Sequence, residues 1–371
     1  MRRKVLFISP LPPPHYGSAM SSKMCLKVLQ DSEKFEVKDI KLNYSKNVAD
    51  MGRFNRDKIV GFFKVKKEIK QKIKEFKPDL IYFMPATSNL GLIRDYFFTR
   101  EIKRHWNEKI LFHLRARITM KDWDNKFFRR IFKKMFLGQK AIILDKSLRG
   151  DLHGLIKEKD LFIVPNAIEN EISEKKLKSI LKDRTKNNSF NIIFLSNMIE
   201  SKGWFKLLEA SKILKERGIK FTCNFVGSWP AKREELKFNA YVERNKLKNY
   251  VRHLGKRTGN AKNKILKDSD VLVFPTEFPL ETFGRVIIEG MMFGLPIIAN
   301  GIAAIPTTIQ NKKTGFVLKE NTPKEIAEKI EKLYRDKDLR EKMGELGRKR
   351  FVKHYTLEFY RKSFNKIILN N

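Results

Sequence analysis

The sequence predicts an α/β protein with two domains, each built on a parallel sheet. Three observations lead to this prediction. The chain has 371 residues, more than a single hydrophobic core usually serves. Short apolar runs alternate with longer amphipathic runs, as expected when helices connect parallel strands. The alternation stops in a polar stretch near the middle of the chain and then starts again, which indicates a second unit of the same class.

The short apolar runs predict buried strands, and the amphipathic runs between them predict helices. The expected strands of the first half are Val5–Ser9, Val37–Lys41, Leu80–Met84, Lys109–His113, Ala141–Leu144 and Leu161–Val164. Those of the second half are Asn191–Leu195, Phe221–Val226, Val251–Leu254, Val271–Phe274 and Pro296–Ala299. The clearest expected helices are Ser21–Gln30, Lys58–Phe76, Trp204–Arg217 and Arg285–Phe293.

These elements divide the chain into four parts. Residues 1–168 form a first domain, 169–189 a polar linker with room for one helix, 190–350 a second domain, and 351–371 a final helix. The two cysteines, Cys25 and Cys223, fall in different domains, so neither a disulfide framework nor a cysteine metal site is expected. A reducing cytoplasm is the compartment that fits this cysteine usage.

The chain is strongly basic, with 79 Lys and Arg residues, 42 acidic residues and a formal net charge of +37. Such a charge attracts polyanions: nucleic acid, anionic lipid or phosphorylated small molecules. A general bias in the amino-acid composition of the source's proteins would give the same net charge. No zinc-finger, RNA-recognition or homeodomain signature accompanies the charge, so we expect no nucleic-acid partner. No apolar run approaches the roughly 20 residues of a membrane-spanning helix.

The most informative motif follows the expected strand that ends at Phe274. A Pro-broken loop, 275–284, leads into a helix that is expected to start near Thr282. Free N–H groups at a helix N-terminus suit a diphosphate, and Gly284 lets phosphates approach the backbone. Glu281 is placed to face sugar hydroxyls, and Glu289, within the helix, to reach a ribose. The alternative is an ordinary strand–loop–helix with two surface carboxylates.

Two further loops follow the first expected strand of each domain, where α/β sheets place ligand loops. In segment 196–204, Lys202 supplies a cation before a helix and Gly203 permits a tight entry into it, although a solvated Lys-Gly turn has the same pattern. In segment 11–19, prolines stiffen the loop and Gly17 permits close approach to a ligand. This loop lacks the G-x-G-x-x-G fingerprint, which argues against an NAD enzyme.

In this order the motifs resemble glycosyltransferase family 4, and the resemblance covers nearly the whole chain. Further matching steps are Ile163–Asn166, Phe225–Gly227, Val251–Gly255, Gly294–Ile298 and Lys313–Val317. The resemblance implies a GT-B fold: two Rossmann-like domains facing each other across a cleft, with a C-terminal helix that crosses back to the first domain. It also implies a retaining transfer from a nucleotide-sugar, UDP by default, without metal or cofactor.

Site residues carry over from the resemblance position by position. Lys202 would bind the donor diphosphate, Glu281 the donor sugar and Glu289 the ribose. The remaining donor-side positions are Gly17, Ser196, Asn197, Arg257, Thr282, Phe283 and Gly284. The chain departs from the family at Ser196-Asn197, where Gly-Arg is usual, and in segment 301–306, which lacks the usual Glu. Arg257 and Arg285 are the candidates to replace the missing arginine.

On the acceptor side, the strand ending at His113 leads into Arg115 and Arg117. The resemblance implies that His113 orients or deprotonates an acceptor, and either Arg115 or Arg117 is expected to hold an acceptor phosphate. A histidine at a strand end also often has a structural role. The acceptor class that the resemblance favours is a saccharide or a lipid-linked sugar, in cell-surface polysaccharide or glycolipid synthesis. Alternatives within the fold are a nucleotide-sugar epimerase or hydrolase, or a donor-binding protein without transfer.

Segment 123–137 has helical spacing, with an apolar stripe beside a basic one. The apolar stripe comprises Phe127, Phe128, Ile131, Phe132, Met135 and Phe136, and the basic stripe Arg129, Arg130, Lys133 and Lys134. This pattern fits a helix lying in an anionic membrane surface. It equally fits an ordinary domain helix with its stripe in the core. The first interpretation predicts a cytoplasmic protein that is peripheral on the inner face of the cell membrane.

Overall fold

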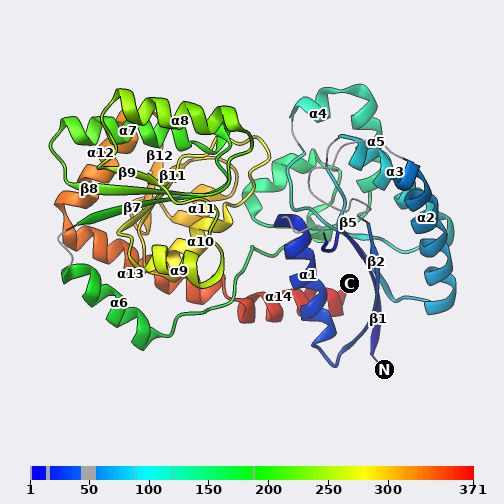
Figure 1. Ribbon diagram of the computed structural model, residues 1–371. Coiled ribbons are helices and arrows are strands. Elements are labelled where there is room, and N and C mark those ends of the chain that lie inside the picture. The colour runs from blue at the N-terminus through cyan, green and yellow to red at the C-terminus, as the bar shows by residue number, and fades with distance from the viewer. Residues whose placement is uncertain (1, 14–16, 43–55, 88, 119, 187–188) are drawn as a thin grey trace. The chain divides into compact units, whose positions relative to one another are not determined.

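The computed structural model describes residues 2–13, 17–42, 56–87, 89–118, 120–186 and 189–371. Two compact units make up the chain. Unit 1 comprises Met1–Pro165 together with Arg361–Asn371, and unit 2 comprises Asn166–Tyr360 (Figure 1). Each unit contains one six-stranded sheet in which all pairings are parallel, so the predicted α/β class is confirmed.

The sheet of unit 1 has the order β2-β1-β3-β4-β5-β6. Its strands are β1 (Arg3–Ser9), β2 (Phe35–Lys41), β3 (Leu80–Phe83), β4 (Leu111–His113), β5 (Lys140–Ile143) and β6 (Leu161–Ile163). Its α-helices are α1 (Gly17–Gln30), α2 (Arg56–Phe76), α3 (Asn89–His105), α4 (Met120–Asp124) and α5 (Lys126–Phe136), with 3-10 turns η1 (Lys146–Leu152) and η2 (Glu158–Asp160). The central strand β3 is buried along its whole length, as its uninterrupted apolar sequence predicts.

The sheet of unit 2 has the order β12-β11-β10-β7-β8-β9. Its strands are β7 (Phe190–Leu195), β8 (Phe221–Val226), β9 (Val251–His253), β10 (Val271–Phe274), β11 (Ile297–Asn300) and β12 (Gly315–Leu318). The other elements are α6 (Glu174–Lys186), η3 (Glu200–Lys202), α7 (Trp204–Glu216), α8 (Lys232–Arg244), α9 (Gly259–Lys267), α10 (Arg285–Met292), α11 (Ile305–Ile309), α12 (Pro323–Arg335), α13 (Lys337–His354) and α14 (Leu357–Asn370).

Each of the predicted strands has a counterpart. The stretch expected to be a linker, 169–189, instead belongs to unit 2 and contains α6, and the expected final helix, 351–371, is divided between α13 and α14. The strand that the sequence did not predict is β12. It needs a glycine at its start, because a Cβ at Gly315 would lie 2.0 Å from the carbonyl oxygen of Ile297 on the neighbouring strand. Gly315 therefore allows two strands to pair where a side chain would separate them.

The C-terminal helix α14 links the two units in sequence: it begins in unit 2, and its residues from Arg361 onward belong to unit 1. There the ring of Phe364 lies 5.7 Å from the ring of Tyr82, centroid to centroid. Arg361 forms an ion pair with Asp31 at 3.4 Å. The predicted return of the C-terminal helix to the first domain is thus confirmed.

The strand order places two of the motif loops side by side. From β7 the chain moves outward through β8 to β9, and it then returns to pair β10 on the other side of β7. The carboxyl ends of β7 and β10 therefore flank the point where the strand order reverses, the usual ligand position in such sheets. The loop 196–203 follows β7, and the loop 275–284 follows β10.

Candidate donor site in the second unit

Lys202 and Glu281 form the centre of the candidate site. Lys202 ends η3, Glu281 lies in the loop after β10, and the Lys202 Nζ is 2.7 Å from the Glu281 Oε2. The two side chains are only 15% and 13% exposed. The other carboxylate oxygen, Oε1, accepts a hydrogen bond from the backbone N–H of Gly284 at 3.0 Å. Lys202 also lies 4.0 Å from the centre of the Phe278 ring. The structure thus brings together three of the residues that the sequence predicted.

Gly203 explains how Lys202 reaches this position. Its φ is +89°, in the left-handed region that favours glycine, and it caps the start of α7. A Cβ at Gly203 would lie 2.2 Å from the carbonyl oxygen of Pro275. The β7 and β10 loops can therefore touch only because residue 203 lacks a side chain. The prediction that Gly203 permits a tight entry into the helix agrees with this geometry.

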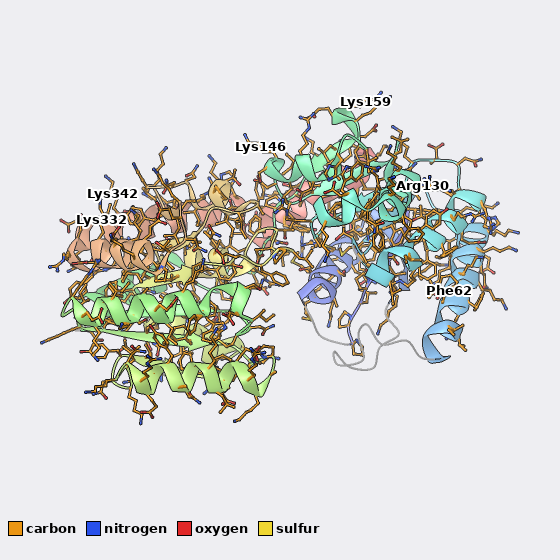
Figure 2. All side chains as sticks on the ribbon, turned by 90° about the horizontal axis from the view of Figure 1, so that it is seen from above. Phe62, Arg130, Lys146, Lys159, Lys332 and Lys342 are labelled. Atoms are coloured by element: carbon orange, nitrogen blue, oxygen red, sulfur yellow. The ribbon has the colours of Figure 1, made fainter. Side chains whose placement is uncertain are left out.

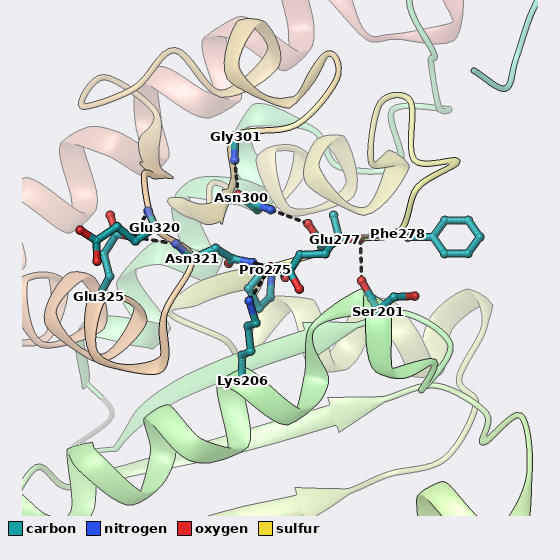
Figure 3. A network of polar contacts seen from close by, with 11 residues as sticks. Ser201, Lys206, Pro275, Glu277, Phe278, Asn300, Gly301, Glu320, Asn321 and Glu325 are labelled. Atoms are coloured by element: carbon teal, nitrogen blue, oxygen red, sulfur yellow. Dashed lines mark hydrogen bonds and ion pairs between the residues drawn. The ribbon is translucent and has the colours of Figure 1, made fainter. Parts of the chain in front are cut away.

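A network of polar contacts holds the β10 loop, and Figure 3 shows its members gathered around Pro275 and Glu277. The Glu277 N–H donates to the Ser201 carbonyl at 2.7 Å, which ties the loop to η3. The Asn321 amide donates to Pro275 O at 3.2 Å and to Glu277 Oε1 at 3.1 Å. Lys206 of α7 completes the network through an ion pair with Glu277.

These contacts also tune the charge of Glu277. The hydrogen bond from Lys206 is the main cause of the lowered pKa of the Glu277 carboxyl; burial opposes it, and the hydrogen bond from Asn321 lowers the pKa further. On the far side of the loop, the Asn300 amide donates to the Thr276 carbonyl at 2.9 Å. The loop that carries Glu281 is therefore held from η3, α7, β11 and the β12–α12 connection (Figure 3). Sequence reasoning missed these partners.

The helix after this loop starts later than predicted. α10 begins at Arg285, not near Thr282, because Gly284 has a φ of +68° and stands at the N-cap position. Thr282 and Phe283 are 8% and 1% exposed, and Phe283 packs on Tyr355. Only their backbone, with that of Gly284, can serve the site as predicted. The side chains instead anchor the loop to the core.

Glu289 lies in the second turn of α10 and is 9% exposed. Its Oε2 is 2.9 Å from the Nζ of Lys262, which belongs to α9, and its Oε1 is 3.8 Å from the Nε of Arg285. Lys262 is a site residue that the sequence did not reveal, since nothing in the sequence of α9 marks it apart from other lysines. It holds the carboxylate predicted to bind a ribose.

The other predicted donor residues lie farther from these contacts or on the other unit. Asn197 and Arg257 are exposed, and among the described residues no carboxylate pairs with Arg257. The backbone of Ser196 packs against Gly227, where a Cβ would lie 1.7 Å from the Ser196 carbonyl oxygen. Gly17 is the first residue of α1 in unit 1. Residues 14–16 of the expected proline loop lie outside the described residues.

His113 lies in the core of unit 1. It has no exposed surface, and its Nδ1 is 2.6 Å from the Tyr82 hydroxyl oxygen. Burial, and then the charge of Arg115, lower the pKa of His113 well below its usual range. These facts favour the structural role and give no direct access to an acceptor, so contact with an acceptor stays a prediction. Arg115 donates to the Cys25 Sγ at 3.1 Å.

The apolar stripe of 123–137 is mainly a core stripe, so its interpretation as a membrane-inserted face was wrong. Ile131, Phe132, Met135 and Phe136 are buried in α5, whereas Phe127 is 57% exposed. The basic stripe remains at the surface. No helix among the described residues is long and apolar enough to cross a membrane. Within the same residues, no group of three His, Cys, Asp or Glu side chains could hold a metal ion.

Comparisons with known proteins find a family match within the second unit. Residues 176–350 match the family described as glycosyl transferases group 1. The capsular polysaccharide biosynthesis glycosyltransferase CapM of Staphylococcus aureus is 30% identical over 185 residues, 49% of this chain and 45% of that protein. The chain thus spans less than half the length of the capsular and colanic-acid proteins that it matches.

Two solved structures share the fold. A glycosyltransferase from Rickettsia africae has a TM-score of 0.74 at 19% identity, and Anabaena HepE in complex with UDP has a TM-score of 0.74 at 14% identity. In both, all of each chain is covered. At such identities the likeness establishes the fold alone, and that fold is GT-B. Residues 176–350 thus match the group 1 glycosyltransferase family, and the whole chain has the fold of these solved glycosyltransferases.

Proposed function

We propose that the chain is a retaining, metal-independent hexosyltransferase that moves a sugar from a nucleotide-sugar, with UDP-sugars favoured, to a saccharide or lipid-linked acceptor. The proposal places it in the synthesis of cell-surface polysaccharide or glycolipid. CapM, named for capsular polysaccharide biosynthesis, supports the pathway class, and the UDP complex of HepE supports the nucleotide. The retaining outcome follows from the resemblance to family 4.

The observation that carries this proposal is the arrangement around Glu281. One carboxylate engages both the Lys202 ammonium and the Gly284 N–H, at 2.7 and 3.0 Å. A cation and a backbone N–H are also the groups that bind a phosphate. Glu281 thus stands where an anion is expected. When a donor binds, its diphosphate takes over these two groups, and Glu281 is released to accept from the sugar hydroxyls.

The charge balance of transfer then needs no metal in this proposal. Breaking the bond between the sugar and the diphosphate places negative charge on the leaving phosphate, and Lys202 meets that charge where water is largely excluded. The leaving diphosphate accepts the proton of the acceptor hydroxyl. Glu289, held by Lys262, fixes the ribose and so the position of the diphosphate.

We also propose that the enzyme works at the cytoplasmic face of the cell membrane. A lipid-linked acceptor would lie there, and the formal net charge of +37 favours an anionic lipid surface. The proposed location is independent of the donor chemistry, so an experiment can contradict either proposal without contradicting the other.

A thermal-shift screen against UDP-, GDP- and ADP-sugars tests the donor assignment, because a ligand that binds only the folded state raises the unfolding temperature. We expect stabilisation by UDP-sugars above the others. Incubation with the stabilising donor alone tests the reaction class. Rapid hydrolysis or epimerisation without an acceptor would contradict transfer and favour the epimerase or hydrolase alternative. With an acceptor, NMR of the product should show the anomeric configuration of the donor.

A further inference from the structure

Large exposed apolar side chains gather on two neighbouring helices of unit 1. On α2, Val60 is 68% and Phe63 is 62% exposed, and on α3, Phe97 is 41% exposed. Phe62 joins the helices: its ring centre lies 6.1 Å from that of Phe97 and 5.2 Å from that of Phe98. The exposed rings are therefore supported by packed aromatic side chains beneath them, which form an aromatic base and hold the rings in place at the surface.

A basic pocket of about 350 Å³ lies beside these rings, between α3 and α5. Its lining residues are Tyr96, Thr99, Arg100, Lys103 and Lys134, three cations with no carboxylate. Lys103 is fixed there, because its Nζ donates to the carbonyl oxygens of Lys134 and Met135 at 2.9 and 3.2 Å. Among the described residues, none of the three cations has a carboxylate partner.

The acidic side chains of α3 point away from this pocket and are neutralised elsewhere. Asp95 is fully buried and pairs with Arg94 at 2.7 Å. Glu101, with 7% of its side chain exposed, is shared by Lys66, Arg104 and His105. The outer surface of α3 and α5 consequently keeps its positive charge. The packed aromatic residues join this charged surface to the exposed apolar side chains of α2.

We propose that the outer surface of α2, α3 and α5 docks on an anionic bilayer, with Val60, Phe63 and Phe97 inserted and a lipid phosphate bound in the pocket of Arg100, Lys103 and Lys134. Apolar groups beside cations and few exposed acids match the layering of acyl chain and headgroup in a membrane surface. The inference rests on the membrane location proposed above and names the surface. The side chains that insert into the membrane are then those of α2 and α3, because the apolar stripe of α5 is buried in the core. Figure 2 labels Phe62 on α2 and Arg130 on α5.

The test is sedimentation of the full chain with phosphatidylcholine vesicles, with and without phosphatidylglycerol. Val60→Ser with Phe63→Ser should lower the partition coefficient about tenfold or more, from the apolar area that no longer inserts. Arg100→Glu with Lys134→Glu should lower it about tenfold or more with phosphatidylglycerol, and little without it.

The matched control is Lys332→Glu with Lys342→Glu, the same charge change on unit 2, where both exposed side chains are labelled in Figure 2. The control should keep nearly all of its binding. An equal loss of vesicle binding in the control would show that binding depends on the total charge of the chain. That result would overturn the proposed phosphate pocket. Unchanged binding of both test variants would overturn the surface. Light scattering adds a further outcome: a dimer that Phe63→Ser disperses would assign the surface to a second copy of the chain.

Each variant is also assayed for UDP-induced thermal stabilisation and for transfer to a detergent-dispersed acceptor. Both should stay unchanged, which shows that the variants fold. A chain that transfers sugar but does not bind vesicles would remove this inference and leave the proposed transferase intact. A chain that binds vesicles through this surface but transfers nothing would do the reverse.

Discussion

Replacing Lys202 by methionine is the sharpest test of the donor site. Methionine keeps a stem that can lie against the Phe278 ring, 4.0 Å from the present ammonium, and removes only the charge. Glu281 then keeps the hydrogen bond from the Gly284 N–H but loses its cation in a setting where it is 13% exposed. Because a poorly solvated carboxylate is left without its counter-charge, we expect a loss of about 1–3 kcal/mol in the free energy of unfolding.

The effect on transfer should be larger than the effect on folding. Removing a fixed group that stabilises charge in a transition state typically lowers the rate about 10²–10³-fold. Glu281→Gln should give the complementary result. It frees the Lys202 ammonium from its carboxylate, so UDP should bind at least as tightly as before, while transfer falls because the sugar loses its acceptor group.

Calorimetric titration with UDP and a transfer assay at saturating donor separate these effects. Lys212→Met is the matched control, since Lys212 lies on α7, is 44% exposed and, of the carboxylates in the described part of the chain, pairs with Glu216 alone, at 3.5 Å. A folded Lys202→Met enzyme with near-normal turnover would refute the assignment. So would a loss of UDP affinity in Glu281→Gln as large as that in Lys202→Met, because Glu281 would then be part of the phosphate site and not its placeholder.

Three further changes have defined outcomes. Gly203→Ala should cost about 3 kcal/mol or more of unfolding free energy in urea titration, because its Cβ meets the Pro275 carbonyl oxygen, whereas Gly218→Ala, at φ +70° with open space around it, should cost only about 1 kcal/mol. Asn321→Gly keeps the left-handed backbone but releases the β10 loop, so the KM for donor should rise about tenfold, and the loss of two buried hydrogen bonds should lower the free energy of unfolding by about 1–3 kcal/mol. His113 has a lowered pKa, so the stability it contributes is complete above the unfolded pKa and is lost as pH falls below about 6.5, by up to about 1.4 kcal/mol per pH unit. His113→Phe should flatten that part of the pH–stability curve.

The fold was largely predictable because its strands are short, continuous apolar runs in a sheet covered on both faces. β10 shows this best: Val271–Phe274 is buried at every position. The sequence did not predict β12, because its apolar run, Phe316–Leu318, is too short to mark a strand by itself. Its strand character depends on Gly315, whose missing side chain permits pairing with β11, and that requirement is visible only once the neighbour is in place.

For the candidate site, the motif predicted two residues that the structure brings together, but not the residues that hold their loops. Glu281 and Lys202 stand in recognisable loops. Lys262 meets Glu289, and Asn321 meets Glu277, only because the fold brings distant segments together. The helix at 126–136 shows where a sequence pattern is ambiguous. An apolar stripe beside a basic one fits a membrane surface and a domain core equally well, and only the burial of Phe132 and Phe136 in the structure decides for the core.

The missing family arginine at Asn197 leaves the question of which cation assists Lys202, and the structure favours Arg285 over Arg257. Arg285 is the first residue of α10, where the helix dipole disfavours a cation by about 0.3–1 kcal/mol, and α10 has no acidic residue in its first turn to offset this. Its nearest carboxylate, that of Glu289, is 3.8 Å away. An anion bound at this helix start would offset the unfavourable interaction between the Arg285 cation and the helix dipole. Arg285→Gln should therefore weaken UDP binding about tenfold yet leave the free chain no less stable, while Arg257→Gln should do neither. An unchanged affinity for UDP in both variants would show that neither arginine assists Lys202.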